Sequence, residues 1–283
     1  MLPDRNGMKR LLASIAIILS ICPDITHAQT YDEWIELSFK YLEANRLDSA
    51  EIALKNALRS EPDNPVNTFL FNNLGTIQRR QGKNEEALQS YTISLTRYPK
   101  NPVFISARAS LFSEMGNFRN ALLDYNTLLD EEPENEEAFY QRGLLYLDMK
   151  DFESSEKDFG KMMELNPQSL YARLGFASLY KIEGLYADAE KTYNYLQDKE
   201  PDNPAVYAGR AELFLLTGKG GKALADINQA IRLSREENPY FYIIRSRAKL
   251  LLHEKKPAAE DIQKAIELGY DTQEAEELLK HTK

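Results

Sequence analysis

Residues 136–167 decide the fold, and they read EEAFYQRGLLYLDMKDFESSEKDFGKMMELNP. Phe139 and Gly143 are four residues apart, so they share one face of a helix. Ser155 and Phe159 repeat this spacing of a small and a large residue in the second half of the segment. Small residues let two helices approach closely while large ones fill the space beside them. The segment therefore predicts two packed helices joined by a tight turn.

The same pattern recurs along most of the chain. Closing prolines stand at intervals of 37, 34, 34 and 34 residues, at Pro62, Pro99, Pro133, Pro167 and Pro201. The small position of the first helix recurs as Ser38, Gly75, Ala109, Gly143, Ala177 and Ala211. Residues that accept a left-handed backbone lie between the two helices, at Asn45, Gly82, Gly116, Gly184 and Gly218. A fixed period near 34 residues indicates an array of helix-turn-helix units.

These columns resemble the tetratricopeptide-repeat family, whose repeat alternates aromatic and small residues and ends in proline. The resemblance implies an all-α fold, a right-handed α-solenoid superhelix of about seven repeats in one domain over residues 29–283. The repeats are expected at about 31–62, 68–99, 102–133, 136–167, 170–201, 204–235 and 239–269. A short capping helix over 271–281 is expected to follow, with Asp271 at its N-cap and Glu274 three residues later.

The first 28 residues have the features of a signal peptide. Basic residues precede an apolar run over 11–21, which is shorter than the roughly twenty residues that a membrane-spanning helix needs. Cleavage is expected between Ala28 and Gln29. Lipid attachment at Cys22 and retention of the segment as an anchor are the alternatives. Cys22 is the only cysteine, so cleavage after Ala28 leaves no disulfide framework.

Arg in the first helix and Asp sixteen residues later occur together. This spacing predicts a hydrogen-bonded ion pair between the two helices of one repeat, with a structural role; a polar ligand site is the alternative. The predicted pairs are Arg108 with Asp124, Arg142 with Asp158, and Arg210 with Asp226. In the seventh repeat the register is ambiguous, and either Arg245 or Arg247 pairs with Asp261.

The sequence offers no motif for catalysis or metal binding, and we expect no enzyme activity, no cofactor and no metal. Beyond residue 28 the only histidines are His253 and His281. The glycine-rich segment 218–223 lacks the spacing of a phosphate-binding loop and lies in a turn between two helices. The formal net charge of −9 disfavours nucleic acid as a partner.

The resemblance implies that first helices line a concave groove that binds peptides or partner proteins. The residues expected to face this groove are Phe39, Asn72, Asn73, Thr76, Tyr140, Tyr171, Lys181 and Tyr242. Chaperone-binding members of the family hold a C-terminal carboxylate with Lys, Asn and Arg in their first three repeats. Only Asn73 matches that set, because Ile35, Phe39, Ser106 and Ala107 occupy most of those positions, so a carboxylate clamp is not expected.

Three functions remain open from the sequence. The first is a periplasmic or envelope-associated adaptor that gathers a protein or peptide partner in the groove, with no membrane span once the signal is removed. The second is a structural subunit of a larger envelope assembly, which has the same fold. The third is an enzyme or glycan-binding protein.

Overall fold

The computed structural model describes residues 29–235 and 237–282, and over these residues it contains fifteen helices and no strand. The expected signal peptide, with its cleavage site after Ala28 and the alternative lipid site at Cys22, falls on residues 1–28, outside the described residues. The chain divides into two compact units, of which unit 1 ends at Leu111 and unit 2 begins at Phe112. Each unit is described by itself.

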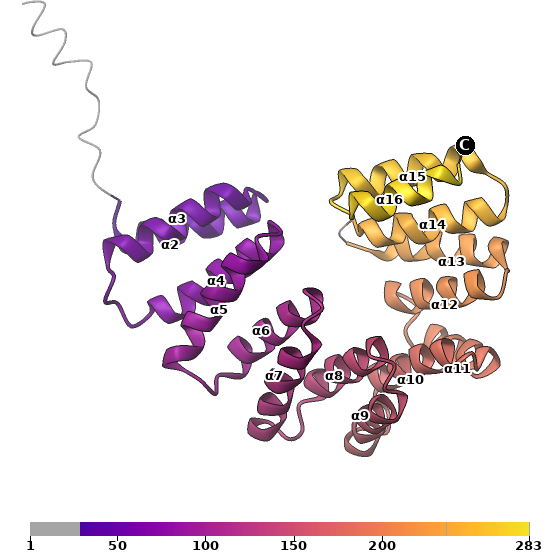
Figure 1. Cartoon of the computed structure of the whole chain (residues 1–283), viewed down its shortest axis with the longest axis horizontal. Helices are drawn as coiled ribbons and strands as arrows, with labels where there is room; N and C mark the ends of the chain where they lie inside the picture. Colours follow the sequence, from indigo (N-terminus) through magenta and orange to yellow (C-terminus); the bar gives the residue numbers. More distant parts are fainter. Residues whose placement is uncertain (1–28, 236, 283) are drawn as a thin grey trace, which may run out of the picture. The chain divides into compact units, whose positions relative to one another are not determined.

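The helices follow one another as pairs along each unit (Figure 1). In unit 1 they are α2 (Tyr31–Glu43), α3 (Leu47–Ser60), α4 (Asn67–Arg80) and α5 (Asn84–Arg97), and α6 (Pro102–Glu114) crosses the boundary. In unit 2 they are α7 (Phe118–Glu131), α8 (Glu136–Asp148), α9 (Phe152–Leu165), α10 (Leu170–Glu183), α11 (Tyr186–Lys199), α12 (Pro204–Leu216), α13 (Gly220–Leu233), α14 (Pro239–Leu251), α15 (Lys255–Glu267) and α16 (Thr272–Lys280). The paired, all-helical architecture confirms the predicted fold class.

Packing inside each repeat follows the small and large columns of the sequence. In unit 1, Ala87 and Tyr91 of α5 are buried against Leu111 of α6. In unit 2, Phe159 of α9 is fully buried. A Cβ added at either Gly143 or Gly175 would stand only 2.5 Å from the nearest carbon of the Phe159 ring. Neighbouring helices are therefore held at a separation that leaves no room for even one methyl group beside this ring.

The turns between paired helices need a left-handed residue. Asn45, Gly82, Gly116, Gly184 and Gly218 have φ between 54° and 82°. Two turns depart from the glycine column, since Lys150 has φ 60° and His253 has φ 61°. The left-handed conformation there is imposed by the packing of the flanking helices rather than by residue preference.

α16 covers the C-terminal end of the last repeat. Asp271 caps it by accepting a hydrogen bond from the Glu274 backbone N–H at 2.8 Å, and Ala275 is fully buried against the rest of unit 2. Arg247 of α14 donates to Glu274 at 3.2 Å. The cap is thus fixed to a first helix as well as to α15.

Candidate functional site

A pocket of unit 2 with a volume of about 700 Å³ lies along the C-terminal ends of α12 and α14. Four leucines line it, and we call them its floor: Leu215 and Leu216 from α12 and Leu250 and Leu251 from α14. Leu216 is 59% exposed and Leu251 46% exposed, so two large apolar side chains face solvent in the same concave surface. We call this surface the leucine pocket. Its size falls in the range of about 300–1,000 Å³ that is typical of ligand sites.

Polar residues also line the leucine pocket, and we call them its rim. They come from α10, α12, α14 and α15, from the turn before α15 and from the end of α16, and they are Lys181, Glu212, Arg247, His253, Lys255 and His281. The rim therefore carries three basic residues and one acid, and it includes both histidines found in residues 29–235 and 237–282.

Glu212 is the acid of the rim and is held by two donors. It accepts a hydrogen bond from Lys181 Nζ of α10, and the Tyr240 hydroxyl of α14 donates to Glu212 Oε1 at 2.6 Å. Burial would lower the pKa of Lys181, but Tyr193 and Glu212 outweigh it and raise the pKa above its ordinary value. Burial, and then Glu212, raise the pKa of Tyr240. Lys181 is therefore cationic and Tyr240 neutral at physiological pH.

A second, smaller concavity of about 410 Å³ lies further towards the N-terminus of unit 2. Glu136, Glu137, Tyr140 and Gln141 of α8 and Tyr171 of α10 line it. The rings of Tyr140 and Tyr171 are arranged edge to face with centroids 5.6 Å apart, and Tyr171 is 60% exposed. Burial raises the pKa of Tyr140 to about 12, so its hydroxyl stays neutral. We call this the tyrosine pocket.

The eight residues expected to face the groove are distributed over both units. Phe39, Asn72, Asn73 and Thr76 lie on α2 and α4 of unit 1. Phe39 is 48% exposed, and Asn72 Oδ1 is buried without a hydrogen-bond partner. Asn73 is half-buried, and the Thr76 hydroxyl bonds to the Asn72 carbonyl at 3.1 Å.

In unit 2, the structure places Lys181 in the leucine pocket and brings Tyr140 and Tyr171 together in the tyrosine pocket. Tyr242 is not among the residues that line either one. Its hydroxyl donates to Glu237 at 3.3 Å, and its ring lies 5.1 Å from the guanidinium carbon of Arg245.

The position of Tyr242 follows from the register of the seventh repeat. Arg245, and not Arg247, bonds to Asp261, with Nε to Oδ2 at 2.9 Å and a terminal nitrogen to Oδ1 at 2.6 Å. Tyr242 then occupies the column of the buried Tyr207. Tyr240 takes the column of Tyr171, which explains why it reaches Glu212.

The predicted ion pairs within unit 2 have bidentate geometry. Arg142 donates to the two carboxylate oxygens of Asp158 at 2.8 and 2.6 Å. Arg210 donates to those of Asp226 at 2.7 and 2.8 Å, with both residues 8% exposed. The pair Arg108 and Asp124 spans the boundary between the units and stays a prediction; Asp124 is buried and Arg108 half-buried.

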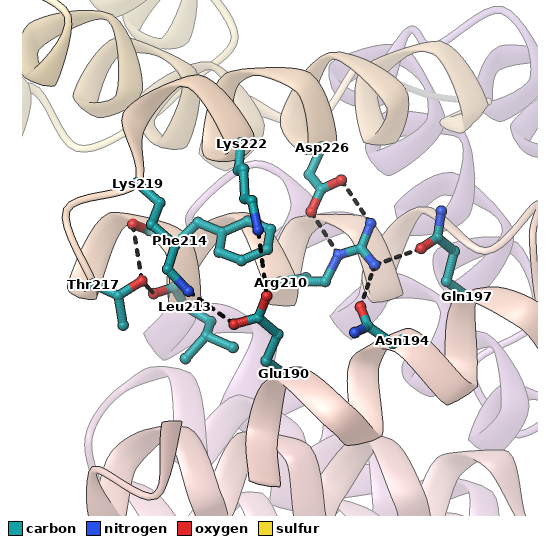
Figure 2. Close-up of polar contacts among 10 residues, drawn as sticks. All are labelled: Glu190, Asn194, Gln197, Arg210, Leu213, Phe214, Thr217, Lys219, Lys222 and Asp226. Carbon is teal, nitrogen blue, oxygen red and sulfur yellow. Dashed lines mark hydrogen bonds and ion pairs between the residues drawn. The ribbon is translucent and has the colours of Figure 1, made fainter. Parts of the chain in front are cut away.

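Arg142, Arg210 and Arg245 also contact the preceding repeat, which the spacing of Arg and Asp did not predict. Figure 2 shows the guanidinium of Arg210 between Asp226 on one side and Asn194 and Gln197 of α11 on the other. Arg142 donates to Asn126 at 2.6 Å, and Arg245 to Asn228 at 3.3 Å. Nε and both terminal nitrogens of each of these three arginines therefore donate to a protein group, which indicates a structural role.

The leucine pocket contains residues that sequence reasoning missed. Leu215 and Leu216 recur 35 residues later as Leu250 and Leu251, a paired-leucine signal at the end of successive first helices. Among the described residues, no group of three or more His, Cys, Asp or Glu side chains is arranged to hold a metal ion. No helix within the described ranges has the length and apolar character needed to cross a membrane.

Comparison with known proteins supports the repeat assignment. Two family models described as tetratricopeptide repeat match the chain, one over residues 40–102 and 106–169 and the other over 146–213. A comparison with curated proteins finds no match.

Solved structures give the same assignment. A tetratricopeptide repeat protein from Parabacteroides merdae is 46% identical, with a TM-score of 0.73, and the match covers 89% of this chain and 98% of that one. Yeast Tom70 is 18% identical, with a TM-score of 0.64 over 92% of this chain and 59% of its own. PilW, a type IV pilus biogenesis factor, is 18% identical, with a TM-score of 0.55 over 77% and 98%. The last two share the fold alone. The chain belongs to the tetratricopeptide repeat family.

Proposed function

We propose that this protein is a non-catalytic interaction scaffold that holds a segment of a partner protein in the leucine pocket of unit 2. The exposure of Leu216 and Leu251 in the lining of a pocket of about 700 Å³ is the observation that carries the proposal. Large apolar side chains grouped in a concavity and surrounded by polar groups have the anatomy of an interaction hot spot. The family fold suggests a protein-interaction scaffold, in agreement with this assignment.

Lys181 and Glu212 form a fixed, hydrogen-bonded pair of opposite charges in the leucine pocket. Lys181 has a raised pKa and carries its proton, and its partner Glu212 accepts hydrogen bonds from two donors. These groups can orient a ligand through fixed charge and hydrogen bonds, which is the role that the proposal gives them.

Site-specific photo-crosslinking tests the proposal. A photoreactive phenylalanine analogue at Leu216 of the full chain, in cells that express the chain naturally, is expected to capture a partner. The same analogue at Ile52 of α3, which is 60% exposed in unit 1, is the matched control. Adducts formed from Leu216 and not from Ile52 are the expected result. The same adducts from both positions, or none from Leu216, would contradict binding at this pocket.

We also propose that the scaffold works outside the cytoplasm, in the periplasm or associated with the envelope. The basic start, the short apolar run over 11–21 and the Thr-His-Ala sequence before Gln29 support export. The expected N-terminal residue of the protein isolated from its own cells is Gln29. Mass spectrometry of the terminal peptide measures this, and a chain that begins at Met1 or Met8 would argue against cleavage.

A further inference from the structure

We infer that the leucine pocket selects a partner segment in which acidic residues flank a large apolar side chain. This inference rests on the proposed function and specifies the chemistry of its partner. Two observations support it. The rim and the chain as a whole carry charges of opposite sign, and Glu212, the acid that lines the pocket, already accepts two hydrogen bonds.

The rim differs in charge from the rest of the protein. The chain has a formal net charge of −9, whereas Lys181, Arg247 and Lys255 line the pocket together with one acid, Glu212. At physiological ionic strength charges are screened beyond about 8 Å, so a bound segment responds mainly to the charges at the pocket, where the three basic residues stand with Glu212 and with Glu274, the partner of Arg247. A partner carrying Asp or Glu is therefore attracted at this place.

Glu212 is poorly available to a basic partner. Its carboxylate already accepts hydrogen bonds from Lys181 and from the Tyr240 hydroxyl at 2.6 Å. A lysine or arginine from a partner would have to displace one of these donors and would then face the charge of Lys181, whose side chain is only 12% exposed. Like charges brought together in a partly buried site oppose binding.

Arg247 is better placed to receive an acidic group. Its side chain is 39% exposed, and Glu274 accepts one hydrogen bond from it at 3.2 Å. A guanidinium has five N–H donors in a planar fork that suits carboxylates. Leu250 and Leu251 follow on the same helix. An acidic residue at Arg247 would thus place a neighbouring apolar side chain of the segment over the leucine floor.

Selection from a library of random twelve-residue peptides tests the inference without assuming a sequence. The full chain serves as bait, and peptides that also bind the Leu216→Glu variant are removed. The remaining peptides are synthesised, and their affinities are measured by fluorescence anisotropy. We expect an excess of Asp and Glu beside Leu, Ile or Phe, and affinity that falls as salt is raised.

Charge reversal identifies the contact. Arg247→Glu is expected to weaken the selected peptides about fivefold or more, the upper range for one exposed ion pair. Lys157→Glu on α9 is the matched control, because Lys157 is also exposed and also paired with an acid, Glu153; its affinity should not change. Circular dichroism checks folding, and Lys255→Glu replaces Arg247→Glu if that variant does not fold.

The possible failures are distinguishable. Peptides that require Leu216 but are neutral or basic, and that bind Arg247→Glu as tightly as wild type, would overturn the inference and leave the proposed function standing. If no peptide depends on Leu216, the proposed function of this pocket fails too. Leu216-dependent binding of dodecanoate without any peptide would assign the pocket to a small amphiphile and would also overturn the inference.

Discussion

The ring of Phe159 gives the sharpest test of how these repeats pack. It is fully buried between α8 and α10, and a Cβ added at Gly143 would stand 2.5 Å from its nearest carbon. Replacing a helical glycine by alanine gains about 1 kcal/mol of helix propensity. Forcing a methyl group into a filled core costs about 1–3 kcal/mol. We therefore expect Gly143→Ala to lower the free energy of unfolding by about 1 kcal/mol.

Gly160 supplies the matched control for this change. It lies in the middle of α9, directly after Phe159, and nothing stands within 4 Å of a Cβ added there. Gly160→Ala gains the same helix propensity without the overlap, and it should raise the free energy of unfolding by about 1 kcal/mol. The difference between the two variants, about 2 kcal/mol, then isolates the cost of overpacking.

Urea denaturation followed by circular dichroism measures both variants. Phe159→Leu added to Gly143→Ala should show favourable coupling in a double-mutant cycle, because the shorter side chain makes room for the methyl group. Equal shifts for Gly143→Ala and Gly160→Ala would refute the reasoning, and so would a double variant whose losses simply add.

Three further perturbations follow from the charged and strained residues. Burial raises the pKa of Glu51, but hydrogen bonds from two lysines outweigh it and lower this pKa to about 2, so the ionised carboxylate should stabilise unit 1 by about 1–3 kcal/mol above pH 4.5. This stabilisation should disappear as the pH falls from 4.5 to 2, which urea midpoints measured against pH would show, and Glu51→Gln should abolish the pH dependence. Arg142→Leu leaves Asp158, only 6% exposed, without its cation, and should cost about 2–4 kcal/mol by chemical denaturation; an unchanged midpoint would contradict this. His253→Gly removes the strain of a left-handed non-glycine residue and should raise the thermal midpoint through a gain of about 0.5–1 kcal/mol, whereas a lower midpoint would show that the imidazole makes a stabilising contact.

The repeat period made most of the fold predictable. Columns of small and large residues at a spacing of 34 give both the pairing of helices and the position of each turn, since the same pattern is satisfied in seven places. Lys150 and His253 are different, because a left-handed lysine or histidine has no local signal and is identified only by its place in the period. Nothing in the columns marks the division after Leu111, since the repeat pattern runs through it without a change.

The candidate site was less predictable than the fold. Lys181 was assigned to the groove from its column alone, but Tyr240, which donates to the Glu212 partner of Lys181, required the register of α14. The sequence left that register open, because the seventh repeat is shorter near Lys255. Either Arg245 or Arg247 could then pair with Asp261 by its separation along the sequence. A pocket assembled from the ends of three first helices and the cap depends on how repeats stack. Patterns within one repeat do not contain that information.

The hydrogen bonds of Arg210 have a consequence for where one module of this protein begins. The sequence unit closes at Pro201, but the guanidinium joins α13 of its own repeat to Asn194 and Gln197 on the far side of that proline (Figure 2). A fragment cut at the proline would keep the carboxylate of Asp226 and lose both amide oxygens. The hydrogen-bonded block around Arg210 is therefore a second helix followed by the next complete hairpin, and it starts half a period before the unit that the prolines mark in the sequence. Chimeras joined at a proline should keep the amide residues of the preceding second helix together with the arginine to which they bond.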